Sequence, residues 1–136
     1  MKKLATITAI ILIIFLIMGC DKYNRNQYIG DWDFEVRRFF WMNDTGPYVN
    51  DTIYYIGKIS REGAANQLKI EFTDNESFLC DIDESGKISK DYENWHYYTR
   101  GEFEGNDKVH IKHGYHGLGS GREFTISGIK KKGGKK

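Results

Sequence analysis

The sequence predicts an all-β domain in which eight short antiparallel strands follow one another as a meander and close into a barrel. Three observations lead to this prediction. Apolar and polar residues alternate with a period of two along most of the chain, which is the pattern of half-buried strands. The chain has 15 glycines and one proline, and 15% of its residues are aromatic. Glycines are typical of turns and aromatic residues of strands, so this composition favours strands separated by turns. Closure would remove the edges of the sheet, and a two-layer β-sandwich of the same strands is the alternative.

The first strand is expected from Asp31 onward. Apolar and acidic residues alternate over residues 31–36, so one face is apolar and the other carries carboxylates. Apolar residues continue over residues 39–42, which predicts a bend or β-bulge near Arg37–Arg38. The turn formers of Asn43–Pro47 then predict a loop.

Seven further segments show the same alternation and are separated by turn residues. They span residues 52–60, 68–72, 78–82, 87–90, 97–104, 109–112 and 124–128. Gly105–Asp107 is a strong hairpin signal, and the four glycines of Gly114–Gly121 predict a loop. Residues 91–96 fit either a loop or a single helical turn.

The N-terminus has the order of a bacterial export signal. Two lysines precede an uncharged run from Leu4 to Met18, and Gly19 and Cys20 follow it. The run is shorter than the roughly 20 apolar residues of a transmembrane helix. Its end resembles a lipobox, and this resemblance implies that Cys20 receives a diacylglyceryl group and that the chain is cleaved before it. Plain secretion and an uncleaved anchor are the alternatives.

The chain therefore divides into four predicted parts. Residues 1–19 form a signal peptide with a helix, residues 20–27 the lipidated cysteine and a polar tether, residues 28–129 the β-domain and residues 130–136 a basic, disordered tail. The formal charge of the full chain is +1, but lysines concentrate in the signal and the tail, so the β-domain is acidic. Because nucleic-acid-binding domains carry a basic face, we expect no nucleic-acid partner.

Gly30 and Trp32, near the start of the first strand and ahead of a β-meander, resemble the start of the lipocalin and lipocalin-like superfamily. In that family the tryptophan closes one end of the barrel, and an arginine from the last strands often covers it. The resemblance gives this role to Arg122, which would stack on Trp32.

Four segments extend this resemblance over most of the chain. Residues 28–32, 55–59, 101–105 and 125–128 look like those of small uncharacterised lipocalin-like bacterial lipoproteins. The resemblance implies a lipocalin-like barrel and an address in the cell envelope, at the outer membrane, facing either the periplasm or the surface. It implies no known activity.

Aromatic residues are the main candidates for a functional role. Seven of them share the inward phase of the predicted strands and form the candidate core or ligand contacts: Trp32, Phe34, Tyr55, Phe72, Phe78, Phe103 and Phe124. They either fill a small barrel or leave a lumen for one apolar ligand. Their bulk in so short a chain favours filling.

No catalytic or metal site is expected. His110, His113 and His116 are three residues apart and would share a face only on a helix. Residues 81–88 resemble the first half of a calcium loop, but Tyr92 stands where a bidentate glutamate is needed, so a β-turn is the simpler interpretation.

Other groups with chemical potential also have structural interpretations. The alternating carboxylates fall on the wet face of the sheet. Cys80 is in phase with Phe78 and Ile82, so we expect it to fill the core.

The sequence therefore predicts a lipid-anchored, non-enzymatic protein of the cell envelope that uses no cofactor and contacts the membrane through its N-terminal lipid. The first hypothesis is that the barrel binds a small hydrophobic ligand. The second is that a filled barrel serves as an interaction or structural module for an envelope protein or a glycan.

Overall fold

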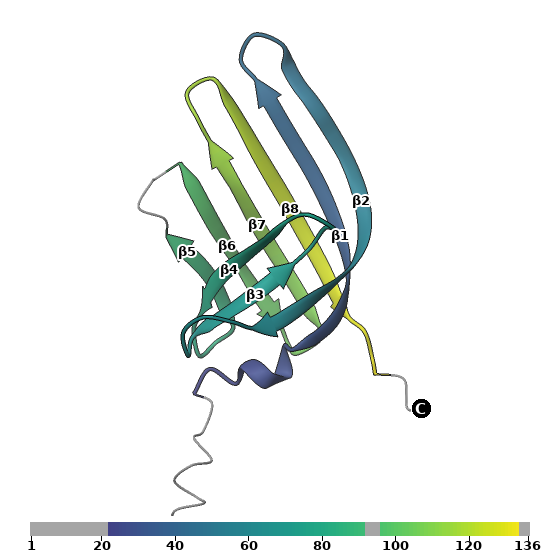
Figure 1. Ribbon diagram of the computed structural model, residues 1–136, viewed down its shortest axis with the longest axis vertical. Helices are drawn as coiled ribbons and strands as arrows, with labels where there is room; N and C mark the ends of the chain where they lie inside the picture. Colours follow the sequence, from purple (N-terminus) through teal and green to yellow (C-terminus); the bar gives the residue numbers. More distant parts are fainter. Residues whose placement is uncertain (1–21, 92–95, 134–136) are drawn as a thin grey trace, which may run out of the picture.

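Eight antiparallel strands form one continuous sheet in sequence order, and pairing between the first and the last strand closes it into a barrel (Figure 1). The computed structural model describes residues 22–91 and 96–133. The predicted signal peptide with its helix, and Cys20, lie outside these residues. The prediction of an eight-stranded meander barrel is confirmed, and the sandwich alternative is wrong because the hydrogen-bonded ladder is unbroken around the sheet.

The chain reaches the barrel through a short 3-10 helix, η1 (Arg25–Gln27). The strands are β1 (Gly30–Met42), β2 (Gly46–Arg61), β3 (Gln67–Glu71), β4 (Ser77–Ile82), β5 (Lys87–Asp91), β6 (Tyr97–Glu104), β7 (Lys108–His116) and β8 (Ser120–Lys130).

The strands differ greatly in length, and this difference divides the barrel into two halves. β2 has 16 residues and pairs with β1 along nearly its whole length, but it pairs with β3 only over Lys58–Arg61. Strands β1, β2, β7 and β8 therefore extend past β3 and β4 (Figure 1). We call the part near η1, where strands surround the interior, the closed half. In the open half, the inner face of the long strands has no opposing strands.

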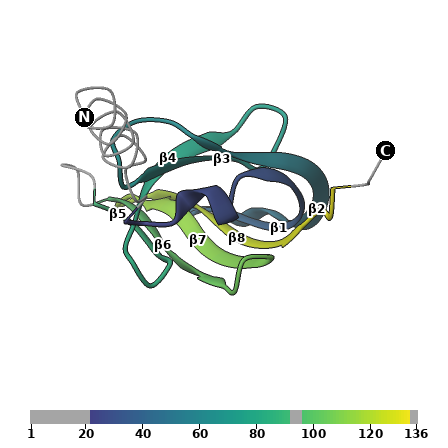
Figure 2. The same ribbon diagram turned by 90° about the horizontal axis from the view of Figure 1, so that it is seen from below.

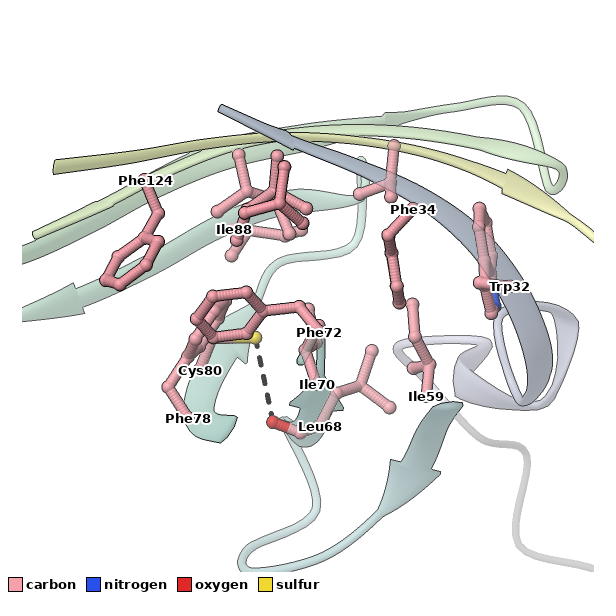
Figure 3. Packing of buried hydrophobic residues seen from close by; sticks show 14 of the residues in the cluster. Trp32, Phe34, Ile59, Leu68, Ile70, Phe72, Phe78, Cys80, Ile88 and Phe124 are labelled. Atoms are coloured by element: carbon pink, nitrogen blue, oxygen red, sulfur yellow. Dashed lines mark hydrogen bonds between the residues drawn. The ribbon is translucent and has the colours of Figure 1, made fainter. Parts of the chain in front are cut away.

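A tightly packed core fills the closed half. The inward residues of β1, Trp32, Phe34 and Val36, are at most 1% exposed. The Phe34 ring lies between glycines of the two neighbouring strands: a Cβ added at Gly57 would lie 2.7 Å from it, and one at Gly128 would lie 2.6 Å from it. Only glycine fits at these two positions, so the closed half is filled, and Figure 3 shows the side chains that fill it.

Helix η1 covers the end of the closed half (Figure 2). Trp32 Nε1 donates a buried hydrogen bond of 2.9 Å to the Tyr28 carbonyl oxygen. The Tyr28 ring stacks on Phe103 with centroids 3.7 Å apart. Lys130 Nζ donates to the Gln27 carbonyl oxygen at 2.6 Å. These contacts join η1 to the start of β1 and the end of β8.

The expected stacking of Arg122 on Trp32 is wrong. The register of β1 and β8 places Lys130 opposite Trp32, and it places Arg122 opposite Phe40 in the open half. Arg122 stacks there on the Phe40 ring, 4.6 Å from its centroid. β8 also continues to Lys130, one residue into the predicted tail, and Lys131 pairs with Asp33 at 3.8 Å.

Three predicted boundaries differ from the structure. The β-bulge lies between Phe40 and Trp41 rather than near Arg37–Arg38. β2 begins at Gly46 and includes Pro47, and the predicted Gly114–Gly121 loop is largely strand. In each case the pairing of long neighbouring strands continues through residues that favour turns in isolation.

Gly57→Ala should lower the free energy of unfolding by about 2 kcal/mol or more, because the new methyl group overpacks the core. It would meet the Glu71 carbonyl oxygen at 2.0 Å as well as the Phe34 ring. Urea titration of the purified domain measures the change. Gly119→Ala is the matched control, since nothing lies within 4 Å of its Cβ. Equal stability of the two variants would contradict the packing described for the closed half.

Candidate functional site

The open half contains a pocket of about 260 Å³ between the inner face of β6, β7 and β8 and the β3–β4 turn. We call this pocket the mouth. Its principal lining residues are Phe72, Glu76, Tyr97, His113, Arg122 and Phe124. A side cavity of about 480 Å³ adjoins it next to β4 and shares Ser77, Tyr97 and His113 with it. This side is accessible because β4 and β5 pair at only two positions, Asp81 with Ser89 and Ile82 with Ile88.

Aromatic rings form the floor of the mouth. The His113 ring stacks on Phe78 with centroids 4.5 Å apart and an interplanar angle of 18°. The Phe72 ring meets Phe124 edge-on with centroids 5.2 Å apart, and it lies tilted against Phe78 with centroids 5.5 Å apart. Figure 3 shows Phe72, Phe78 and Phe124 gathered at the end of the core opposite Trp32. The floor is therefore a continuation of the core.

His113 brings an uncharged polar group to this floor. It continues the inward phase of Val109 and Ile111 on β7, and its Nδ1 lies 2.9 Å from the hydroxyl oxygen of the fully buried Thr99. Burial, assisted by the positive charge of Arg122, lowers the pKa of His113 to about 4. The imidazole is therefore neutral at physiological pH.

Arg122 is the charged group at the rim of the mouth. Its guanidinium lies over the rings of Phe40 and Phe124, 4.6 and 5.4 Å from their centroids. Its Nη2 donates to Glu76 Oε1 at 2.6 Å, which links β8 to the β3–β4 turn. A second ion pair lies on the same inner face, where Arg38 donates to both carboxylate oxygens of Asp51 at 2.7 and 2.5 Å. The hydrogen bond from Arg38 lowers the pKa of Asp51.

The seven predicted aromatic residues separate into three groups. Trp32, Phe34 and Phe103 are buried in the closed half, whereas Phe72, Phe78 and Phe124 floor the mouth. Tyr55 is half-buried, and the register places it opposite the inward-facing Phe34.

The sequence did not bring Glu76, His113 and Arg122 together as one site, although His113 and Arg122 were considered in other roles. His113 is in phase with two buried residues of β7, so extending the alternation past Lys112 would have placed it on the inner face. The glycines that follow suggested a loop there instead. Glu76 and Arg122 come from distant parts of the chain, and only the register of the barrel brings them together.

The three histidines do not converge on one site. His110 points to the outer face, where its Nδ1 lies 3.2 Å from the Ser127 hydroxyl, while His113 points inward. Within residues 22–91 and 96–133, no group of three or more His, Cys, Asp and Glu side chains is placed to hold a metal ion.

The acidic turn after β4 uses its carboxylate internally. Asp83 Oδ1 accepts hydrogen bonds from the Ser85 hydroxyl at 2.6 Å, the Ser85 amide at 2.8 Å and the Lys87 amide at 3.0 Å. The bond from the Ser85 hydroxyl contributes most to lowering the pKa of Asp83. These bonds account for the residues as a turn, in line with the simpler interpretation; Tyr92 lies outside the described residues.

Cys80 lies in the core and is unreactive. Its Sγ donates to the Leu68 carbonyl oxygen at 3.6 Å (Figure 3). Burial raises the pKa of its thiol to about 12, so the thiolate that would act as a nucleophile is not formed at neutral pH.

The outer face of the sheet carries a wider groove of about 620 Å³ across β2, β1, β8 and β7. We call it the outer groove. Tyr54, Ile56 and Ile129 line it and are 78%, 60% and 61% exposed. Its walls are exposed side chains that can change rotamer, whereas the mouth has a buried aromatic floor. The mouth is therefore the better-formed site of the two.

Comparison of the chain with family models, with curated proteins and with solved structures gave no match. Across the described part of the chain, no helix has the length and apolar character needed to cross a lipid bilayer.

The pKa of His113 predicts a specific loss of stability in mild acid. The unfolded imidazole binds a proton below its ordinary pKa of about 6.5, while the folded one stays neutral down to about pH 4. The contribution of neutral His113 to the free energy of unfolding is therefore complete above pH 6.5. It falls as the pH is lowered, by about 2 kcal/mol between pH 7 and pH 5.

Urea titration at the two pH values, compared with His113→Gln, isolates this contribution from the other titrating groups. The variant should lose about 2 kcal/mol less than the wild type on acidification. His110→Gln, which changes an exposed histidine, should keep the wild-type dependence. An unchanged dependence in His113→Gln would show that His113 is not buried as a neutral group.

Proposed function

We propose that this protein is a lipid-anchored, lipocalin-like binding protein of the cell envelope that takes a small hydrophobic molecule at the mouth of its barrel. One observation carries the proposal: the aromatic core continues into a pocket that opens to solvent instead of ending under a covering layer. The mouth and the adjoining side cavity together exceed the roughly 300 Å³ of typical small-ligand pockets. Their shared residues Ser77, Tyr97 and His113 join the two spaces.

The chemistry of the mouth suits binding rather than catalysis. Each carboxylate on this face, Glu76 and Asp51, is paired with an arginine. His113 is neutral, and its Nδ1 is engaged with Thr99. A hydrophobic ligand would gain about 25 cal/mol for each Å² of apolar surface it buries against the rings. No group of the site is poised as a nucleophile or general base, so we assign it no reaction and no cofactor.

The anchor also suits a binding role, because it would point the mouth away from the membrane. Lys22, two residues after Cys20, pairs at 2.9 Å with Glu84 in the β4–β5 turn at the closed half. A lipid on Cys20 would therefore hold the closed half against the bilayer. The open half, at the opposite end in Figure 1, would face the aqueous compartment.

A second candidate function is supported by the outer groove. Three exposed apolar side chains, Tyr54, Ile56 and Ile129, lie together in this groove among charged and polar residues. Such a surface is typical of a site that contacts a protein or glycan partner. In this case the barrel would serve as an interaction module, and the mouth would stay empty.

Two matched tryptophan variants distinguish the candidates. His113→Trp enlarges an inward-facing side chain that lines both the mouth and the side cavity, and Ser127→Trp adds the same bulk in the outer groove. N-phenyl-1-naphthylamine, an uncharged apolar probe that fluoresces when bound, reports affinity. His113→Trp should weaken binding at least about tenfold, while Ser127→Trp should leave it within about twofold. The reverse pattern would assign binding to the outer groove.

Cys20→Ser should release the protein from the membrane, because a serine hydroxyl cannot form the thioether bond that attaches the lipid. The expected result is a shift from the membrane fraction to the soluble fraction, with loss of labelled fatty acid from the protein. Cys80→Ser is the matched control and should retain both membrane association and label. Membrane association that survives in Cys20→Ser would exclude the lipid anchor.

A further inference from the structure

Arg122 is held at the mouth in an orientation that leaves most of its donors unused. Its guanidinium carbon lies over the rings of Phe40 and Phe124, and the contacts described for it engage only the Nη2 end, with Glu76. An arginine carries five N–H donors in a planar fork that suits carboxylate and sulfonate oxygens. The two rings restrict the side chain, so less entropy is lost when it binds an anion.

Glu76 is a counter-ion that a ligand can replace at low cost. The Arg122 and Glu76 side chains are 49% and 30% exposed, so their ion pair is partly hydrated. Such pairs contribute little to stability. Glu76 also lies in the short turn between β3 and β4, where its carboxylate can return to water without disturbing a strand.

The other charged groups on this inner face do not offer the same opportunity. Arg38 is bound by both oxygens of Asp51. His113 is uncharged, as described above. Lys90, in the side cavity, pairs with Asp81 at 3.8 Å. Arg122 is therefore the cation of the mouth itself whose positive charge a ligand can use.

An apolar ligand on the aromatic floor would cover Arg122 and remove water from its guanidinium. A charged group that loses its water needs a close counter-charge. An anion carried by the ligand supplies that charge and lets Glu76 stay hydrated, whereas an uncharged ligand would bury the Arg122–Glu76 pair, and burial of both ions carries a desolvation penalty.

We propose that the ligand of the mouth is a hydrophobic organic anion whose acid group displaces Glu76 from Arg122 while its apolar body rests on Phe72 and Phe124. This inference rests on the proposed function of the mouth and adds the chemical class of its ligand.

Two probes with the same body test the inference. 8-Anilino-1-naphthalenesulfonate is N-phenyl-1-naphthylamine with one added sulfonate, so the difference between them reports the anion alone. Arg122→Gln should weaken binding of the sulfonate probe at least about tenfold and binding of the uncharged probe by no more than about twofold. Glu76→Gln should strengthen binding of the sulfonate probe several-fold, because the competing carboxylate is gone. Lys112→Gln removes the same charge from the outer face and should change neither affinity by more than about twofold.

The outcomes separate the inference from the function beneath it. If the uncharged probe binds at the mouth but Arg122→Gln affects both probes equally, or neither, the anionic ligand is excluded and the binding function stands. If neither probe binds the wild type at the mouth, both fall. Should Arg122→Gln fail to fold, Glu76→Gln decides: an unchanged or weaker affinity for the sulfonate probe overturns the proposal.

Discussion

The barrel closes only as far as its shortest strands reach, and this constraint shapes both halves of the molecule. β3 and β5 have five residues each, whereas β1 has 13 and β2 has 16. Where the short strands are present, inward side chains meet across the interior and exclude solvent. Beyond them the long strands keep the same alternation, but nothing faces their inner side. The mouth is thus an extension of the core that strands cover on one side only.

The polarity of the inner face follows this division. From the closed end outward, the inward residues of β7 are Val109, Ile111, His113 and Tyr115, and those of β8 are Gly128, Ile126, Phe124 and Arg122. Apolar side chains occupy the positions that other strands cover, and polar ones occupy the positions that remain open. Burial of unpaired polar groups is costly, so the polar residues lie where water or a ligand can reach them. Thr99 is buried, but it has His113 as its hydrogen-bond partner. The same gradient explains why the mouth combines an aromatic floor with a charged rim.

Period-2 alternation was enough to predict the strands and the closed core. Trp32, Phe34 and Val36 were assigned to the inner face from their spacing, and the Gly105–Asp107 turn from its composition. Features that depend on register could not be predicted in this way. Arg122 was expected beside Trp32 because the lipocalin resemblance puts an arginine of the last strands there, but alternation does not say which residues lie opposite each other. The mouth depends on that register and on the unequal strand lengths, which become clear only when the neighbours of each strand are known.

Cys80 gives this barrel an internal reporter of its own opening. Its thiol is fully shielded and hydrogen-bonded to Leu68 between β3 and β4, the strands that wall the closed half. A thiol reagent can reach the sulfur only when these two strands part from the rest of the sheet. The rate of alkylation at this residue therefore measures how often the barrel opens, and no label has to be introduced. In an oxidising compartment the same shielding prevents this cysteine from forming a disulfide between two molecules as long as the barrel remains closed.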